Sequence, residues 1–221
     1  MSKKVFISTS SFAKYDEEPL QKLQSEGFEV VLNPHGRKLT EEESLQFLQD
    51  VDALLAGTET LTQSVLRQAK QLRVISRCGV GLDNVDLDVA KELGIQVFNT
   101  PDSVTQSVAE LTIGFMLNLL RKVSAMDQEV KQGVWQKQMG SLLMGKRVGI
   151  IGFGRIGQKV ASLVSAFGAN VSYHDIEKKD SDYDYQSLEQ LLTESDIISV
   201  HVSSFTPGNP LIGAKEINQM K

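Results

Sequence analysis

Short apolar runs alternate with amphipathic stretches along the first hundred residues of this chain. Five runs have the length and composition of buried strands, at 4–8, 28–32, 51–57, 73–77 and 95–99. Four stretches between them place apolar residues at helical spacing, at 17–27, 39–50, 62–72 and 87–94. Thr40 and Glu43 have the spacing of a capping box, which predicts where one of these helices begins. Repeated alternation of strand and helix predicts a parallel sheet with helices on both faces.

A second alternation of strands and helices follows a long helical pattern. From about Ser107 to Lys131 the pattern predicts one connecting helix, longer than an average helix. Its apolar residues exceed what a connector needs, and they are Val108, Leu111, Ile113, Phe115, Met116, Leu119 and Leu120. Beyond it, strands are predicted at 148–151, 170–175 and 196–202, and helices at 156–167, 187–194 and 211–221. We therefore expect two doubly wound α/β domains, at 1–100 and 101–221, with the second incomplete at its C-terminus because its last helix lacks a following strand.

The segment GFGRIG lies between a predicted strand and a predicted helix. Its glycines, Gly152, Gly154 and Gly157, fit the pattern G-x-G-x-x-G, which is typical of dinucleotide binding in this strand–turn–helix setting. Gly152 would permit the tight bend, Gly154 would let a pyrophosphate approach the backbone, and Gly157 would let the helix lie close to the sheet. The first N–H groups of the helix, including those of Arg155 and Ile156, would bind the pyrophosphate.

An acid follows at the distance that such a site requires. Asp175 ends the next predicted strand, 18 residues after Gly157, where a carboxylate can accept the hydroxyls of an adenosine ribose. The alternative is a packing turn followed by a solvated aspartate. A carboxylate here would repel the 2′-phosphate of NADP and favours NAD, although Lys178 and Lys179 could partly offset that repulsion.

Composition narrows the class of protein. The chain has 221 residues, of which 41% are hydrophobic and 23% charged, as in ordinary globular proteins. A net charge of −5 without a basic cluster argues against a nucleic-acid partner. A single cysteine, Cys78, excludes an internal disulfide and fits a reducing compartment. The N-terminus lacks a signal-peptide core and no apolar run suits a membrane span, so we expect a cytoplasmic protein without a membrane partner. No metal site is predicted.

Three stretches together resemble the NAD-dependent D-2-hydroxyacid dehydrogenase family, most closely its D-3-phosphoglycerate dehydrogenase branch. SRCGVGLDNVD at 76–86 resembles the substrate loop, NTPDSVTQSVAELTIGFMLNLLR at 99–121 the interdomain helix, and GKRVGIIGFGRIGQKVA at 145–161 the nucleotide fingerprint. The resemblance covers nearly the whole chain. It implies a flavodoxin-like substrate domain, a Rossmann domain that binds NAD, a small 2-hydroxy or 2-keto acid as substrate, and a two-fold homodimer.

The resemblance also implies a set of site residues. For the substrate it implies Arg77, which would contact an acidic group, Val80, and Gly79 and Gly81, whose N–H groups would form an anion nest. A plain βα turn is the alternative for this loop. The implied cofactor residues are Val80, Thr105, Gly152, Gly154, Arg155, Ile156, Gly157, Asp175 and Val202.

No catalytic residue is expected within these 221 residues. In the family, the catalytic His, its acid partner and the carboxylate-binding Arg all follow the helix that 211–221 resembles. His35, His174 and His201 are interpreted as surface or strand histidines. The stretch LLAGTETLT at 54–62 has no basic residue where the phosphoglycerate branch often carries an Arg, which puts phosphate recognition in doubt. Trp135 is expected to be a packing anchor.

Two functions are consistent with this sequence. The first is an NAD-dependent oxidoreductase acting on 3-phosphoglycerate or a related 2-hydroxy acid, with this chain lacking the catalytic segment and inactive by itself. In that case the reaction would belong to serine biosynthesis or a related pathway. The second is a non-catalytic NAD-binding module with a regulatory or assembly role, for which the sequence contains no partner-binding motif. The reading frame beyond Lys221 would distinguish them.

Overall fold

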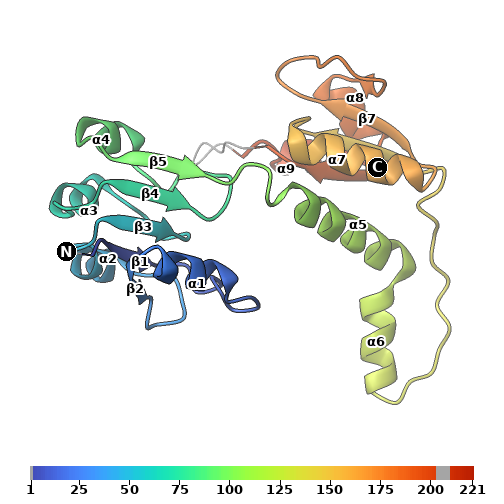
Figure 1. Cartoon of the computed structure of the whole chain (residues 1–221). Helices are drawn as coiled ribbons and strands as arrows, with labels where there is room; N and C mark the ends of the chain where they lie inside the picture. Colours follow the sequence, from blue (N-terminus) through green and yellow to red (C-terminus); the bar gives the residue numbers. More distant parts are fainter. Residues whose placement is uncertain (1, 203–209) are drawn as a thin grey trace. The chain divides into compact units, whose positions relative to one another are not determined.

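The computed structural model describes residues 2–202 and 210–221. The chain divides between Ser103 and Val104 into two compact units, the N-terminal unit and the C-terminal unit. In each unit, parallel strands alternate with helices, as the hydrophobic pattern predicts (Figure 1). Among the described residues, no helix combines the length and apolar character needed to cross a bilayer.

The N-terminal unit is built on a five-stranded parallel sheet in the order β2-β1-β3-β4-β5. This is the flavodoxin-like order. Its strands are β1 (Lys4–Ile7), β2 (Glu29–Leu32), β3 (Ala53–Ala56), β4 (Val74–Arg77) and β5 (Gln96–Asn99). Its helices are α1 (Glu18–Ser25), α2 (Glu41–Phe47), α3 (Gln63–Gln68) and α4 (Leu87–Glu92).

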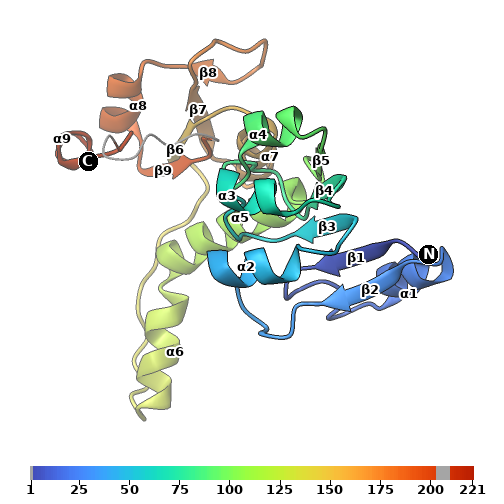
Figure 2. The same ribbon diagram turned by 90° about the vertical axis from the view of Figure 1, so that its left-hand side faces the viewer.

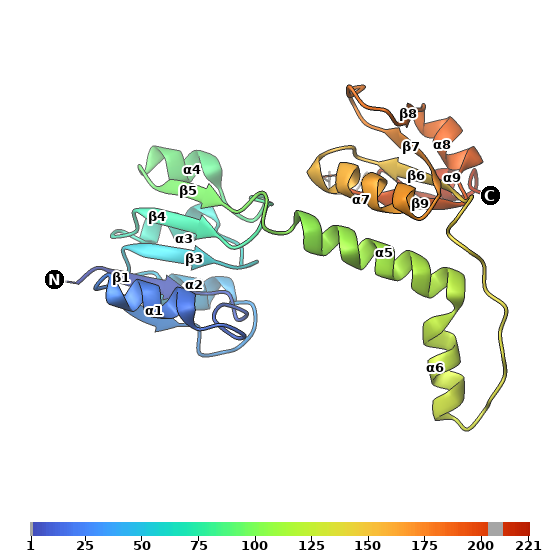
Figure 3. The ribbon, with the colours of Figure 1, turned by 45° about the vertical axis from the view of Figure 1, so that its right-hand side comes forward.

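Helices cover both faces of this sheet. Helices α2, α3 and α4 lie on one face and α1 on the other (Figures 2 and 3). The main core lies under α2, α3 and α4, where Phe6, Leu54 and Ile75 of the strands are fully or almost fully buried. The predicted capping box at the start of α2 is confirmed, because the Thr40 hydroxyl accepts the Glu43 N–H and the Glu43 carboxylate accepts the Thr40 N–H.

The C-terminal unit has a four-stranded parallel sheet in the order β8-β7-β6-β9. This corresponds to strands 3-2-1-4 of the Rossmann order. Its strands are β6 (Arg147–Ile151), β7 (Asn170–His174), β8 (Asp184–Tyr185) and β9 (Ile197–Val200). Its helices are α5 (Thr105–Arg121), α6 (Val123–Lys131), α7 (Arg155–Ala166), α8 (Leu188–Glu194) and α9 (Ala214–Ile217). The short strand β8 was not predicted, since a two-residue strand leaves no periodic pattern.

Two cores flank the sheet of the C-terminal unit. On one face, α5 and α7 pack side by side over β6 and β7, where Val160, Val164 and Tyr173 are fully buried (Figure 3). On the other face, Leu191 and Leu192 of α8 pack against Ile151. Helix α6 extends from the end of α5 and turns away from the sheet (Figures 1 and 3).

The prediction of one continuous helix from about 107 to 131 is wrong, because the helix breaks at Lys122. This residue adopts a left-handed conformation, with φ of 56°, which ends α5. The Asn118 side-chain oxygen then accepts the N–H of Ser124, in the first turn of α6, at 2.9 Å. An asparagine inside the first helix therefore satisfies one of the free N–H groups at the start of the second.

Candidate functional site

The glycine turn between β6 and α7 has the shape that the sequence predicts. Gly152 has φ of +89°, and a Cβ placed on it would lie 2.6 Å from the carbonyl oxygen of His201. A Cβ on Gly157 would overlap the carbonyl oxygen of Gly152, so the start of α7 lies directly against the turn. Among the described residues, leaving out the immediate neighbours of Gly154 and the backbone of its own helix, no atom lies within 4 Å of the place where a Cβ of Gly154 would stand. Close packing therefore requires glycine at positions 152 and 157, whereas the backbone at Gly154 has open space beside it.

The N-terminus of α7 faces that open space. Gly154 is the N-cap of this 12-residue helix, and the structure records no side-chain capping bond there. The positive end of the helix dipole and the first-turn N–H groups thus form an anion site. The Gln158 side chain donates to the carbonyl oxygen of Phe153 at 3.0 Å and braces the turn from within the helix.

Asp175 lies next to the turn, directly after β7. Its carboxylate accepts the backbone N–H of Phe153 at 2.6 Å, so the acid is tied to the middle of the glycine segment. Burial raises the pKa of Asp175, but hydrogen bonds from the N–H groups of Phe153 and Glu177, together with the charge of Lys179, outweigh it and hold the pKa below its usual value. Asp175 is therefore ionised at neutral pH, and one carboxylate oxygen is already oriented by the backbone.

Two residues of the site were missed by sequence reasoning. Ile176 follows Asp175 and is 96% exposed. The second is Phe153, whose N–H orients the acid and whose ring is buried. An apolar residue directly after a strand-end acid was the available signal for Ile176. Nothing in the sequence indicated the bond between Phe153 and Asp175, which are 22 positions apart.

The structure brings Val202 to the glycine turn. A Cβ on Gly152 would lie 2.9 Å from the backbone nitrogen of Val202, and the Val202 side chain is 45% exposed. Thr105 is the first residue of α5, and its hydroxyl oxygen is buried without a partner among the described residues. Arg155 and Ile156 stand in the first turn of α7.

The predicted substrate loop belongs to the N-terminal unit. Arg77 is the last residue of β4, and its guanidinium folds back to donate to the carbonyl of Cys78 and lies over Gly79. Val80 and Gly81 are exposed. The Gly79 N–H, which is predicted to form an anion nest with that of Gly81, donates to the Thr100 hydroxyl at 2.9 Å, so an anion would have to displace this bond. Gly79 has φ of +143°, a conformation that favours glycine, and a Cβ there would overlap the Arg77 guanidinium.

A buried carboxylate stands after β3, where no basic residue was found. Glu59 is only 2% exposed, and its carboxylate accepts the Ser8 hydroxyl at 2.5 Å and the Gly57 N–H at 3.1 Å. The Asn84 side chain, from the predicted substrate loop, donates to the Glu59 carbonyl at 2.6 Å. Glu59 thus joins the ends of β1 and β3 to that loop.

Each histidine has a partner inside its own unit. The His35 ring packs on Phe47 and lies 3.4 Å from the carboxylate of Glu43. His174 Nδ1 lies 2.9 Å from the Gln186 carbonyl oxygen. His201 lies 2.8 Å from the Ser199 hydroxyl, and burial lowers its pKa, so it is neutral at pH 7.

A parallel sheet in this order, a glycine turn onto a helix and an acid after the next strand define a dinucleotide-binding protein of the Rossmann class. Residues 113–221 match the family model described as "D-isomer specific 2-hydroxyacid dehydrogenase, NAD binding domain". The chain belongs to the D-isomer specific 2-hydroxyacid dehydrogenase family, and this segment is its NAD-binding domain.

Individual relatives agree with the family model. The chain is 36% identical to hydroxypyruvate reductase of Thermotoga maritima, over 95% of this chain and 72% of that protein. It is 38% identical to D-3-phosphoglycerate dehydrogenase of Methanocaldococcus jannaschii, over 83% of this chain and 37% of that protein. The crystal structure of TT0316 protein from Thermus thermophilus matches with a TM-score of 0.85 and 33% identity, over 92% of this chain and 66% of that one. The chain thus spans between 37% and 72% of the length of these relatives.

Proposed function

We propose that this chain carries the NAD site and the substrate loop of an oxidoreductase that transfers hydride between a small 2-hydroxy acid and NAD. The observation that carries the proposal is the bond between the Asp175 carboxylate and the Phe153 N–H, which places an ionised acid beside the open end of α7. In this proposal the N–H groups of residues 154–157 bind the pyrophosphate and Asp175 accepts the ribose hydroxyls. Ile176 packs on the adenine, and Val202 lines the same end of the site.

The nicotinamide, when bound, accepts or donates the hydride exchanged with the 2-carbon of the acid. The residues of this chain bind and orient the cofactor. Selection of NAD over NADP follows from charge, because the Asp175 carboxylate would repel a 2′-phosphate. The ammonium group of Lys179 pairs with the carboxylate of Glu177 at 3.2 Å, while its charge also helps to lower the pKa of Asp175.

The substrate class is proposed from the relatives and from the substrate loop. Proteins named hydroxypyruvate reductase, D-3-phosphoglycerate dehydrogenase and glyoxylate reductase match at 35–38% identity. Each of these names contains a 2-hydroxy or 2-keto acid, so we propose that the substrate is 3-phosphoglycerate or a related small acid. Arg77 would approach its carboxylate after leaving the Cys78 carbonyl. We also propose that the protein works in the cytoplasm.

We propose a homodimer formed through α5, α6 and the segment that follows them. Leu111, Phe115 and Leu119 are spaced four residues apart on α5 and are 57%, 57% and 76% exposed. The predicted role of Trp135 as a packing anchor is not met within the described chain, where its side chain is 91% exposed. Met139 and Met144 are also largely exposed. A second copy is the partner that would cover this apolar surface, as two-fold interfaces pair identical patches.

A non-catalytic NAD-binding module is the second candidate function. The observation that favours it is the engagement of all three histidines with partners in their own units, which leaves them poorly placed to move a proton of the substrate.

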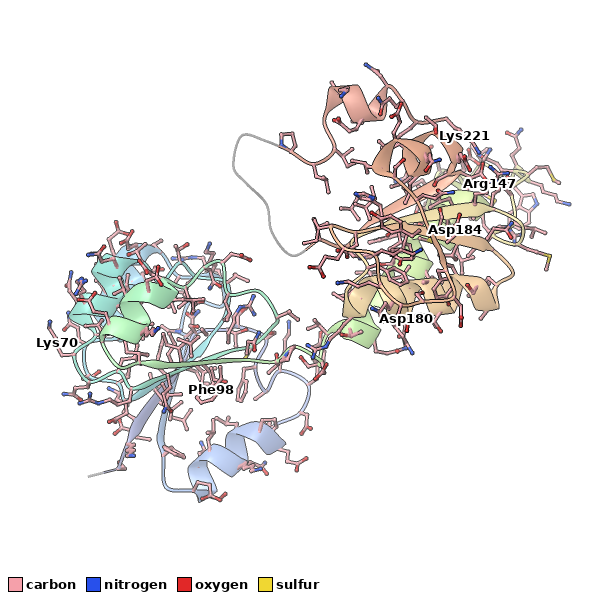
Figure 4. The ribbon with its side chains drawn as sticks, turned by 90° about the horizontal axis from the view of Figure 1, so that it is seen from above. Lys70, Phe98, Arg147, Asp180, Asp184 and Lys221 are labelled. Carbon is pink, nitrogen blue, oxygen red and sulfur yellow. The ribbon has the colours of Figure 1, made fainter. Side chains whose placement is uncertain are left out.

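The proposed cofactor site is tested by calorimetric titration of NAD into the wild type and Asp175→Ala. Loss of a charged hydrogen-bond acceptor costs about 1.5–3 kcal/mol, so NAD affinity should fall by about 10- to 100-fold. NADP affinity should stay unchanged or rise. The control is Asp180→Ala, which removes an exposed acid of the same loop (Figure 4) and should bind NAD like the wild type. Equal NAD binding by the wild type and Asp175→Ala would refute the assignment.

A further inference from the structure

Tyr173 closes the loop that carries Asp175. It lies on β7, two residues before the acid, and its side chain is 0% exposed. Its hydroxyl donates to the carbonyl oxygen of Lys179 at 2.8 Å and accepts the N–H of the same residue at 3.0 Å. One side chain thus pins both backbone polar groups of Lys179 and fixes where the loop from Asp175 to Lys179 returns to the sheet.

The ring of Tyr173 also contacts the glycine turn. It stacks on the ring of Phe153, with centroids 3.9 Å apart and planes at 20°. Phe153 is the residue whose N–H donates to the Asp175 carboxylate. Tyr173 therefore touches the turn with its ring and the acid-bearing loop with its hydroxyl, and both segments meet at Asp175.

The hydroxyl is not needed to fill the core. A phenylalanine would occupy the same space and keep the stacking on Phe153, without the cost of burying a polar group. The two bonds to Lys179 are what the hydroxyl adds. These bonds also fix the backbone position from which the Lys179 side chain extends, and its ammonium group pairs with Glu177.

We propose that Tyr173 is a positioning residue that sets the cofactor selectivity of the site. By pinning Lys179, it holds Asp175 against the Phe153 N–H and keeps the Lys179 ammonium beside Glu177, away from the position of a 2′-phosphate. Without the hydroxyl, the loop opens, the acid loses its orientation and the lysine becomes able to meet that phosphate. This inference rests on the proposed function, because it takes Asp175 as the acceptor of the adenosine ribose.

The test compares NAD and NADP binding by the wild type, Tyr173→Phe and Tyr183→Phe, using calorimetry on the full chain. Tyr183 is the matched control, because its ring meets the edge of the Phe153 ring in the same aromatic cluster. For Tyr173→Phe we expect NAD affinity to fall by about tenfold, while NADP affinity is maintained or rises. The ratio of the two dissociation constants should stay at the wild-type value in Tyr183→Phe. Adding Lys179→Ala to Tyr173→Phe should abolish any gain in NADP binding.

A merely structural role would give a different result. Loss of stability alone would weaken both cofactors equally and leave their ratio unchanged, and that outcome would overturn the inference. Hydrogen exchange on the wild type tests it without a variant: the Lys179 amide should be protected before NAD is added, and rapid exchange there would also overturn it. If Asp175→Ala fails to weaken NAD, the proposed site itself is wrong. If Asp175→Ala weakens NAD but Tyr173→Phe keeps the wild-type ratio, only the role of Tyr173 fails.

Discussion

At the scale of single residues, glycines with one sequence pattern do different work in this protein. Gly157 has no room for a side chain, because the carbonyl of Gly152 occupies that space. A Cβ on Gly154 would meet no described atom within 4 Å, so the fold itself does not require a glycine there. The missing side chain would matter only to a bound ligand. Substitution of Gly157 should therefore affect mainly stability, and substitution of Gly154 mainly NAD binding.

Alanine substitutions test that separation. Gly157→Ala should lower the free energy of unfolding by about 1–3 kcal/mol, because a methyl group is forced against backbone. Gly154→Ala should cost less than about 1 kcal/mol, the scale of a changed N-cap, yet weaken NAD strongly, because its methyl group fills the space of the pyrophosphate. Chemical denaturation and calorimetric titration measure the two effects. Equal stability losses would show that the open space at Gly154 is not real.

At the scale of elements, helix ends depend on local charge as well as on apolar pattern. The start of α2 is closed by Glu43, whose carboxylate also accepts two bonds from Arg37 at 2.6 and 2.8 Å. The bonds from Arg37 and from the Thr40 N–H lower the pKa of Glu43 to about 2. The folded pKa lies below the unfolded value, so the stabilisation is present above the unfolded pKa and disappears as the pH falls through the folded one.

The prediction is a pH-dependent difference between the wild type and Glu43→Gln. The melting temperature of the wild type should exceed that of the variant above about pH 5, where the carboxylate is ionised in both states. The excess should shrink between about pH 4.5 and pH 2 as the folded carboxylate takes up its proton. Calorimetric melting at a series of pH values measures it. A difference that stays constant over this range would contradict the proposed cause.

The apolar surface of α5 and α6 gives a second prediction for elements. Leu119→Glu places a charge in the proposed two-fold interface and should convert a dimer to a monomer at micromolar concentration, measured by light scattering. Leu87→Glu is the control, since Leu87 is an exposed leucine of the N-terminal unit and lies outside the proposed interface. A wild type that is monomeric, or a variant that stays dimeric, would contradict the proposal.

At the level of the whole molecule, we expect the chain to bind NAD without catalysing hydride transfer. The proposed cofactor site lies in the C-terminal unit and the proposed substrate loop in the N-terminal unit. Hydride transfer also requires that the alcohol proton be moved and the carbonyl polarised. Removing one such group costs about 10²- to 10⁴-fold in rate.

We therefore predict that residues 1–221 bind NAD but show no measurable turnover of phosphoglycerate, lactate or glycerate. The physical reason within the described residues is that His35, His174 and His201 each have a partner in their own unit. NADH absorbance measures turnover. Robust turnover by residues 1–221 would overturn the interpretation of these histidines as non-catalytic.

The order and type of the main strands and helices, the capping box of α2, and the glycine turn with its acid could all be predicted from the amino-acid sequence. These features depend on neighbours a few positions apart, where apolar spacing and the lack of a Cβ act directly. For the same reason, the sequence predicts that Gly152 allows the tight bend and that Gly157 allows the helix to pack closely. The strand-end position of Asp175 followed from the apolar run before it.

Which polar groups already have hydrogen-bond partners became clear only from the folded structure. The Gly79 N–H is taken by Thr100, 21 positions away, and the Glu59 carboxylate by Ser8, 51 positions away. Lys122 ends α5, and the Asn118 side chain accepts an N–H at the start of α6, although the apolar pattern runs through the break. Tyr173 meets Phe153 and Lys179 together only because β6 and β7 lie side by side. Hydrogen bonds and ring contacts between distant segments have no periodic signature in a sequence, so the fold alone assigns them.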